Sequence, residues 1–214
     1  NEYQWKPQEE TGSEEMKVNP GNVLDLTSST AADGTLIWAA PEGRWILLQI
    51  GAVPTGTRNA QAAPHAMGWE VDKMNKHHLK KHFDSYIGKL LERMPAEERT
   101  ALKHVVLDSY EQGSQNWTEN MIEDFEVKYG YDPVPWFPVF TGRVVGSADQ
   151  SDRFLWDWRR LVADRIAYDY VGGFRELCQE KGLRIWLENY GHWGFPSEFL
   201  MYGGQSHDVA GEFW

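Results

Sequence analysis

Three glutamates stand at positions where enzymes often carry reactive side chains. Glu111 lies just beyond the apolar run His104–Ser109, and Glu188 ends a second run, Leu183–Glu188. Glu212 lies in a Gly-Glu-Phe-Trp sequence. A carboxylic acid in a suitable pocket acts as a general acid. A second carboxylate can activate water or attack the anomeric carbon of a sugar. These residues therefore predict a two-carboxylate site of the kind that hydrolyses glycosides.

The same acidic residues also have structural interpretations. A carboxylate after a strand often caps the next helix or pairs with a surface lysine. Glu70 and Asp72 alternate around Val71, so both point the same way in an extended segment. For these two residues a salt-bridged loop is favoured over catalysis.

Histidines are the other candidates for proton transfer or metal binding. His78 and His82 share a helix face, but a zinc helix needs glutamate after the first histidine, where Leu79 stands. These side chains are therefore interpreted as solvated. His192 and His207 lie in later loops rich in glycine and aromatic residues, where they can touch a substrate.

Aromatic residues are abundant, with 11 Trp, 9 Tyr and 9 Phe in 214 residues. The simpler explanation is an aromatic core. The alternative is a sugar cleft, because flat rings offer a large contact area together with a polar group. Composition alone leaves both open.

Charge and cysteine content exclude several classes of protein. The chain has 21 Lys+Arg against 32 Asp+Glu, a net charge of −11, which disfavours a nucleic acid or an anionic membrane as the main partner. Apolar stretches are short, so no membrane insertion is expected. The one cysteine, Cys178, excludes an intrachain disulfide and a cysteine-based zinc site. Neither a phosphate-binding glycine loop nor a serine nucleophile elbow is present.

The first third of the chain predicts little regular structure. Residues 1–20 are polar and acidic, which indicates a tail or loop. The β-rich runs Thr35–Ala40 and Arg44–Ile50 flank Pro41-Glu42-Gly43 and predict a β-hairpin. Residues 21–67 are therefore interpreted as a hairpin and a linker.

Helical and strand patterns alternate in the rest of the chain. Apolar residues three and four apart predict a helix capped by Asn75 and ended by Pro95, with a short helix after it. The run His104–Ser109 predicts a strand buried on both faces, as in a parallel sheet. The other predicted elements are a helix capped by Thr118 and closed by Gly130, a loop over 131–150, a helix over 152–181 with a break near Gly172-Gly173, and a strand over Leu183–Glu188.

This order predicts an α/β fold. Alternating helices and strands form parallel βα units. Polar clusters follow both strands, at the face where active residues of a (β/α) barrel lie. A closed barrel has eight strands and typically about 250 residues. We therefore expect part of a (β/α) TIM-type barrel over residues 68–214, preceded by the hairpin, with a smaller open sheet as the alternative.

Five short segments occur in an order that is similar to glycoside hydrolase family 106, the α-L-rhamnosidases. The segments are Gly68–Lys73 (GWEVDK), Asp108–Thr118 (DSYEQGSQNWT), Gly130–Asp132 (GYD), Leu187–Gly191 (LENYG) and Gly211–Trp214 (GEFW). The part from Ser109 to Thr118 is the most specific of them. The resemblance covers roughly residues 20–214.

The resemblance implies a (β/α) barrel with appended β-sandwich domains, an inverting mechanism and a calcium ion in the active site. By motif, the general acid maps to Glu111 and the water-activating carboxylates map to Glu188 and Glu212. Calcium, which prefers oxygen ligands, would orient sugar hydroxyls, and its ligands are not assigned. The residues expected to contact the sugar are Tyr110, Asn116, Trp117, Asn189, Tyr190, His192 and Trp193.

Members of that family are several times longer. We therefore expect this chain to be a piece of a larger multidomain protein, with the rest of that polypeptide as its partner. The expected substrate is a terminal α-L-rhamnosyl residue of an oligo- or polysaccharide, and the expected location is the bacterial periplasm or the exterior. The alternatives are a non-catalytic carbohydrate-binding protein, a hydrolase or lyase of the same fold with another sugar specificity, and a structural fragment without its own function.

Overall fold

The computed structural model describes residues 13–59, 62–192 and 194–211. The chain divides into two compact units. The first unit comprises residues 1–51 and 120–158, and the second comprises residues 52–119 and 159–214. No helix in the described ranges is long and apolar enough to cross a membrane.

Aromatic side chains form the core of the first unit. The Phe125 ring lies 5.7 Å from that of Trp158 and 5.9 Å from that of Phe154, measured between centroids. Such ring pairs contribute beyond their buried area. The regular elements are β1 (Lys17–Val18) paired in parallel with β3 (Val144–Val145), α3 (Met121–Tyr129), the 3₁₀ segment Val134–Thr141 and the first part of α4 (Ala148–Arg165). Part of the predicted 131–150 loop is therefore regular.

The β-hairpin prediction is wrong. Within the described residues, Thr35–Ala40 and Arg44–Ile50 form no strands, and the pairing found nearby is one antiparallel bridge between Thr30 and Leu36. Apolar side chains of these runs face solvent, and Leu47 is 63% exposed. An isolated two-stranded hairpin is marginal in water. Without a packed layer over these residues, their β-propensity does not fix a pairing.

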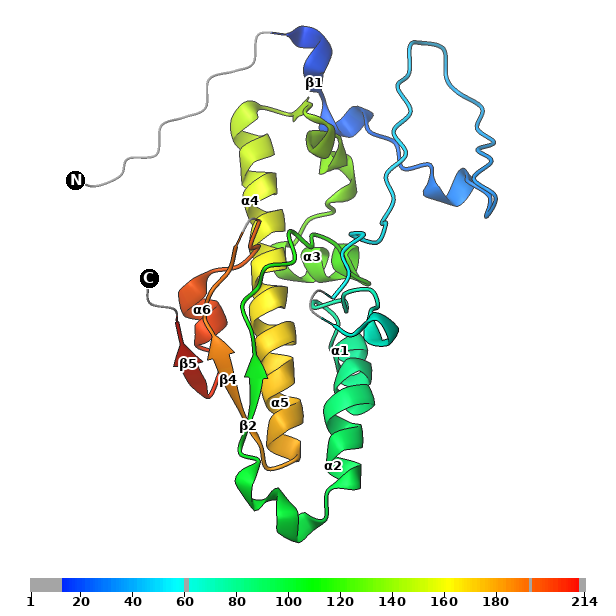
Figure 1. The fold of residues 1–214 in the computed structure, drawn as a ribbon. Helices are drawn as coiled ribbons and strands as arrows, with labels where there is room; N and C mark the ends of the chain where they lie inside the picture. The colour runs from blue at the N-terminus through cyan, green and yellow to red at the C-terminus, as the bar shows by residue number, and fades with distance from the viewer. Residues whose placement is uncertain (1–12, 60–61, 193, 212–214) are drawn as a thin grey trace, which may run out of the picture. The chain divides into compact units, whose positions relative to one another are not determined.

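The second unit contains a parallel three-stranded sheet in the order β2–β4–β5 (Figure 1). In its register Leu107 lies opposite Leu187, and Trp186 lies opposite Asp208. The strands are β2 (His104–Leu107), β4 (Arg184–Glu188) and β5 (Asp208–Ala210). The predicted α/β class with parallel strands is confirmed. A closed barrel is not shown by the part of the chain described.

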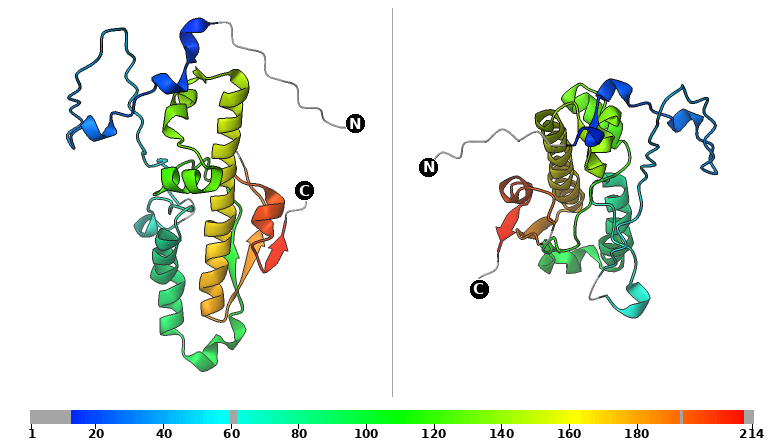
Figure 2. Two further views of the ribbon diagram at one scale, coloured as in Figure 1. Left: turned by 180° about the vertical axis from the view of Figure 1, so that it is seen from behind. Right: turned by 90° about the horizontal axis from the view of Figure 1, so that it is seen from above.

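Helices cover one face of this sheet. α5 runs along β4, as the opposite views of Figure 1 and Figure 2 show. The helices of the unit are α1 (Lys76–Phe83) and α2 (Lys89–Arg93) joined by a π turn, the end of α4 joined by a π turn to α5 (Gly172–Glu180), and α6 (Phe199–Gly203). Asn75 caps α1 as predicted, because its side chain accepts hydrogen bonds from the amides of His77 and His78.

The Gly172-Gly173 pair does not break the helix, contrary to the prediction. A Cβ at Gly173 would lie 3.2 Å from Lys76 Cγ and 3.4 Å from Leu79 Cδ2. Glycine at this position therefore allows α1 and α5 to approach closely. Gly173 is explained by helix packing and not by a turn.

Burial alternates along the strands, so the expectation of strands buried on both faces is wrong. Val105, Leu107, Ile185 and Leu187 are buried beneath the helices, whereas Val106 is 61% exposed. The open face carries, from the start to the end of the strands, His104 and Arg184, then Val106, Trp186 and Asp208, then Asp108 and Glu188. The helices in the described residues pack against one face only, and the periodicity of two follows from that.

His207 makes folding of this unit sensitive to acid. Its Nδ1 accepts a hydrogen bond of 3.0 Å from the Ile185 amide, which requires an unprotonated Nδ1. Burial lowers the pKa of His207 below 6.5, and the cations Arg184 and Arg175 act in the same direction while Asp208 opposes them. Below pH 6.5 the unfolded chain therefore binds more protons than the folded one.

We expect the free energy of unfolding to fall as pH drops through 6.5, and to fall less in His207→Asn, whose Oδ1 can replace Nδ1 as acceptor. Thermal unfolding of both proteins at pH 7.5, 6.5 and 5.5 measures this difference. The nearby titratable His104 and Asp208 are common to both proteins and cancel. Parallel curves for the two proteins would contradict the prediction.

Candidate active site

The carboxyl ends of β2 and β4 are joined by backbone pairing that continues beyond both strands. The Tyr110 amide donates to the Tyr190 carbonyl, and the His192 amide donates to the Tyr110 carbonyl, each at 2.9 Å. This parallel bridge brings the segment after β2 beside the segment after β4. Two predicted site segments, 80 residues apart in the chain, therefore lie together at one edge of the sheet, as expected for parallel strands.

Ser109 connects the two glutamates that lie at this edge. Its amide donates to Glu188 Oε2 at 3.2 Å, and its hydroxyl donates to Glu111 Oε2 at 3.0 Å. Because covalent geometry keeps the serine nitrogen and Oγ within about 4 Å, the two carboxylate oxygens lie within about 10 Å of each other. His192 Nδ1 lies 3.8 Å from Glu111 Oε1. The side chain of Glu111 is 49% exposed, so a ligand from solvent can reach it.

A buried ion pair lies beside this edge. Lys73 Nζ contacts Glu70 Oε2 at 2.6 Å, and their side chains are 8% and 19% exposed. The ammonium also lies 5.6 Å from the ring centroid of Tyr110 and 5.8 Å from that of Tyr170. Cations over aromatic faces are stabilised by the ring quadrupole. The expected salt-bridged role of Glu70 is confirmed.

Gln115 and Thr118 tie the same loop to the segment after β2. The Lys73 amide donates to Gln115 Oε1 at 3.1 Å, and the Gln115 amide group donates to Asp72 Oδ1. Thr118 Oγ1 donates to Asp72 Oδ2 at 2.7 Å. The structural role expected for Asp72 is confirmed. The predicted helix cap at Thr118 is wrong, because its hydroxyl is used here and Asn120 occupies the cap position of α3.

Tyr110 is an interior residue in this structure. It is 3% exposed, and its ring packs against Phe195 and Tyr170. Burial raises the pKa of its hydroxyl to about 12, and the charge of Glu70 acts in the same direction. Its hydroxyl therefore stays neutral at physiological pH. The ring supports the loop that carries Glu111, and it does not face solvent as a sugar platform would.

The residues after β4 are partly open to solvent. The rings of Tyr190 and His192 stack, with centroids 6.0 Å apart. The Asn189 amide donates to the Ala210 carbonyl at 2.8 Å, which fixes it beside β5. Asn189 Oδ1 is buried and has no hydrogen-bond partner among the described residues. A buried unpaired amide oxygen costs free energy, and it is suited to accept a hydrogen bond from a ligand.

The other predicted site residues have different placements. Asn116 is exposed and Trp117 is half-buried. Glu212 and Trp193 lie outside the described residues.

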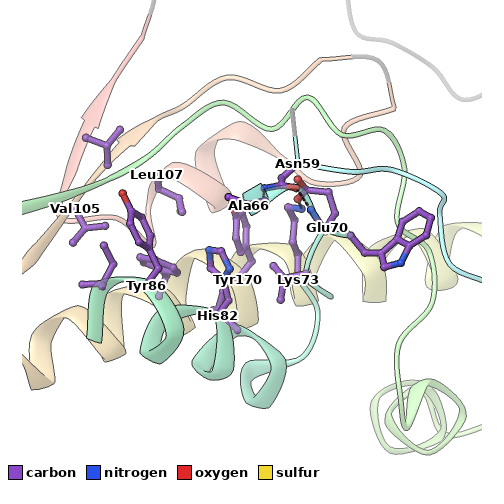
Figure 3. Close-up of a pocket in the computed structure, with 16 residues that line it drawn as sticks. Asn59, Ala66, Glu70, Lys73, His82, Tyr86, Val105, Leu107 and Tyr170 are labelled. Carbon is purple, nitrogen blue, oxygen red and sulfur yellow. Dashed lines mark hydrogen bonds and ion pairs between the residues drawn. The ribbon is translucent and has the colours of Figure 1, made fainter. Parts of the chain in front are cut away.

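A hollow of about 480 Å³ lies between α1, β2 and the loop that carries Glu70. Figure 3 shows Glu70, Lys73 and Asn59 at one end of it, with His82 and Tyr86 rising from the helical segment toward β2. Neither Glu111 nor Glu188 lines it. The hollow is therefore separate from the edge that holds the paired glutamates.

Calcium finds no ready set of ligands in the described ranges. No three acidic, histidine or cysteine side chains gather there as a metal site requires. The oxygens of Asp72 already accept hydrogen bonds from Gln115 and Thr118. The described residues do not by themselves fit a calcium site, and calcium remains a prediction from the resemblance.

Three residues of this site were not singled out from the sequence. Ser109 lies between Asp108 and Glu111, and a hydroxyl next to two carboxylates was a usable signal. Lys73 follows the alternating acids Glu70 and Asp72, which indicates an ion pair but not its burial. Gln115 gives no local signal, because its partners lie 42 and 43 residues away.

Comparison with known proteins shows which proteins this chain is similar to. A protein of Formosa agariphila that carries the provisional name β-glucuronidase is 34% identical over 200 residues, which is 94% of this chain and 17% of that protein. The solved structure of a rhamnosidase from Novosphingobium sp. PP1Y matches 88% of this chain and 18% of its own with a TM-score of 0.74 and 32% identity. This chain spans less than a fifth of either relative. The family described as alpha-L-rhamnosidase, glycoside hydrolase family 106, matches residues 1–214, and the chain therefore belongs to that family.

Proposed function

We propose that the protein containing this chain hydrolyses terminal α-L-rhamnosyl residues from oligo- or polysaccharides. The observation that carries the proposal is the pair of Glu111 and Glu188, linked through Ser109 at the carboxyl ends of two parallel strands. Family membership supplies the class of sugar. The carboxylate oxygens of Glu111 and Glu188 lie at most about 10 Å apart. This bound is compatible with the ~6.5–9.5 Å between the two carboxyl groups of an inverting glycosidase.

In the proposed reaction Glu111 is the acid and Glu188 is the base. Glu111 gives its proton to the glycosidic oxygen while the bond from that oxygen to the anomeric carbon breaks, and the bonding electrons stay on the oxygen. Water attacks the anomeric carbon from the opposite face and loses a proton to Glu188. The products are an alcohol and β-L-rhamnose. Glu212 is the second candidate for the base, as the motif resemblance implies.

The three parallel strands support a further part of the proposal. We infer that β2, β4 and β5 belong to a (β/α) barrel that other parts of a longer polypeptide complete. Glu111 follows β2 and Glu188 ends β4, at the face where barrel enzymes carry their active residues. The open sheet face, with Val106 61% exposed, would then line the barrel interior. A solved structure of the full-length protein tests this inference.

The same proposal includes a calcium ion, the remaining polypeptide as a partner, and a periplasmic or secreted location. Calcium, when bound, would orient oxygen atoms of the sugar. Elemental analysis of the purified full-length protein, and its activity after chelation and dialysis, test the metal. Full activity without calcium would remove it from the proposal.

β-Glucuronidase activity is the second candidate, because the Formosa agariphila relative carries that name. An aryl α-L-rhamnoside and an aryl β-D-glucuronide, assayed side by side with the full-length protein, separate the two. Our proposal expects hydrolysis of the rhamnoside. Hydrolysis of the glucuronide alone would replace the rhamnosidase assignment, and binding of sugar without any hydrolysis would indicate a non-catalytic carbohydrate-binding protein.

Gly203→Ala tests the predicted role of Asn189. A Cβ at position 203 would lie 2.8 Å from Asn189 Nδ2 and 3.0 Å from its Cγ, so the amide group must move. Alanine is favoured over glycine in a helix by about 1 kcal/mol, which offsets the clash. We expect kcat/KM for the rhamnoside to fall about tenfold, since small displacements of positioning groups are costly, with little change in the unfolding temperature.

The matched control for this variant is Gly51→Ala, where an added Cβ meets nothing within 4 Å. Its kcat/KM is expected to equal that of the unmodified protein. Equal activity of Gly203→Ala and the control would remove Asn189 from the proposed sugar contacts.

A further inference from the structure

We propose that Ser109 is a positioning residue that holds Glu111 and Glu188 as one pair and selects the oxygen of Glu111 that carries the transferable proton. The proposal rests on the proposed hydrolase function. Ser109 uses two different groups for this, its backbone amide toward Glu188 and its hydroxyl toward Glu111. One half-buried residue thereby contacts both carboxylates.

The position of Ser109 is fixed on both sides. β2 ends two residues before it, and Leu107 is paired with Leu187 of β4. Directly after it, Tyr110 is held by backbone hydrogen bonds to Tyr190 and His192 at 2.9 Å each. Ser109 therefore cannot shift relative to the β4 segment without breaking these pairings. Groups locked by their surroundings are what a reactive geometry requires.

The two hydrogen bonds have different consequences. The amide of Ser109 always carries its hydrogen and can only donate, and Glu188 Oε2 at 3.2 Å shares it with Asp108 Oδ1 at 3.0 Å. This contact fixes the orientation of the Glu188 carboxyl group, which suits the role proposed for Glu188.

The hydroxyl contact selects one oxygen of Glu111. Oε2 accepts from Ser109 Oγ at 3.0 Å, and Oε1 lies on the side of His192 at 3.8 Å from Nδ1. When Glu111 is protonated, the oxygen that accepts a hydrogen bond is the carbonyl oxygen, and the proton is carried by the other one. The structure thus assigns Oε1 as the atom that protonates the glycosidic oxygen.

Ser109→Ala removes the hydroxyl and keeps the amide, and Ser109→Thr keeps both. In the full-length protein, with a rhamnoside of a poor leaving group, we expect Ser109→Ala to lower kcat about tenfold with KM nearly unchanged. Ser109→Thr is expected to restore the rate.

A structural role alone gives a different result. If Ser109→Ala raises KM as much as it lowers kcat, or if Ser109→Thr fails to restore the rate, the positioning proposal is overturned. The exposed Ser85, in the π turn after α1, supplies the control Ser85→Ala, which is expected to change none of these quantities.

The proposal also has a test that does not depend on activity. In protein labelled with ¹³C at glutamate carboxyls, the Glu111 resonance is identified by its loss in Glu111→Gln. Ser109→Ala is expected to change the chemical shift of that resonance, because the carboxylate loses the hydroxyl donor, and an unchanged chemical shift would overturn the positioning proposal. If the unmodified protein hydrolyses no rhamnoside while Ser109→Ala still changes the chemical shift, the proposed function is rejected and the contact between Ser109 and Glu111 is retained.

Discussion

Glu111→Gln is expected to lower kcat on a rhamnoside with a poor leaving group by about 10²–10⁴-fold, the usual effect of losing a general acid. Glutamine preserves the shape of the side chain and can still accept the hydrogen bond from Ser109. It has no proton to give to the leaving oxygen. Because the Glu111 side chain is 49% exposed, the substitution is expected to leave the unfolding temperature nearly unchanged.

Two comparisons make this result specific. An activated aryl rhamnoside needs less protonation of its leaving group, so Glu111→Gln should affect it much less. Glu180→Gln, an exposed acidic residue at the end of α5, is expected to keep full activity on both substrates. If Glu111→Gln retains more than half of the rate on the poor leaving group, Glu111 is not the acid.

Lys73→Met is expected to destabilise the second unit by about 3 kcal/mol, the lower end of the range for breaking a buried ion pair. Lys73 is 6% exposed, and its loss leaves Glu70 charged and largely buried. The effect is expected at the lower end because the Glu70 side chain retains 19% exposure. Hydrogen exchange of peptides from β2 and β4 measures the opening free energy of this unit within the full-length protein.

The double variant Lys73→Met with Glu70→Gln is expected to recover much of this loss, because no unpaired charge remains. Lys80→Met, which removes an exposed pair with Asp84 on the neighbouring helical segment, is expected to cost less than about 1 kcal/mol. A Lys73→Met variant as stable as Lys80→Met would show that the Glu70 pair does not stabilise this unit.

The sequence predicted those features that local pattern or strand order determines. Asn75 at the start of an apolar helical repeat predicted its cap correctly, and Gly182 lies in the left-handed conformation after α5 as a helix end. The apolar runs around Val105 and Ile185 predicted parallel strands, which pair in register. Since parallel strands end at one edge, the meeting of the Glu111 and Glu188 segments followed from their order.

The features that failed depend on partners distant in the sequence. Thr118 has the side chain of a helix cap, but its hydroxyl donates to Asp72, 46 residues earlier. Gly173 has the type of a helix breaker, but it lies where α1 packs against α5. The predicted hairpin at residues 35–50 has strand-forming residues, but no sheet packs on them in the part of the chain that the structure describes. Local propensity is overridden by tertiary contacts in the first two cases, and in the third it lacks the contacts that would fix a strand pairing.

The exposure of one face of the strands also depends on segments distant in the sequence. A continuous apolar run predicts burial on both sides, yet Val106 and Trp186 are 61% and 36% exposed. Whether a sheet face is covered depends on which segments pack on it, and a single strand carries no information about them. The alternating burial therefore became visible only in the structure.

The anomer of the first sugar released tests the central claim most directly, namely that Glu111 and Glu188 act as an acid and base pair on a rhamnoside. Proton NMR of the full-length protein with an aryl α-L-rhamnoside, recorded before mutarotation, distinguishes the two anomers of rhamnose. The proposed inverting pair predicts that β-L-rhamnose appears first and that the α-anomer grows only as mutarotation proceeds. Initial release of α-L-rhamnose would show a retaining reaction and would contradict the account.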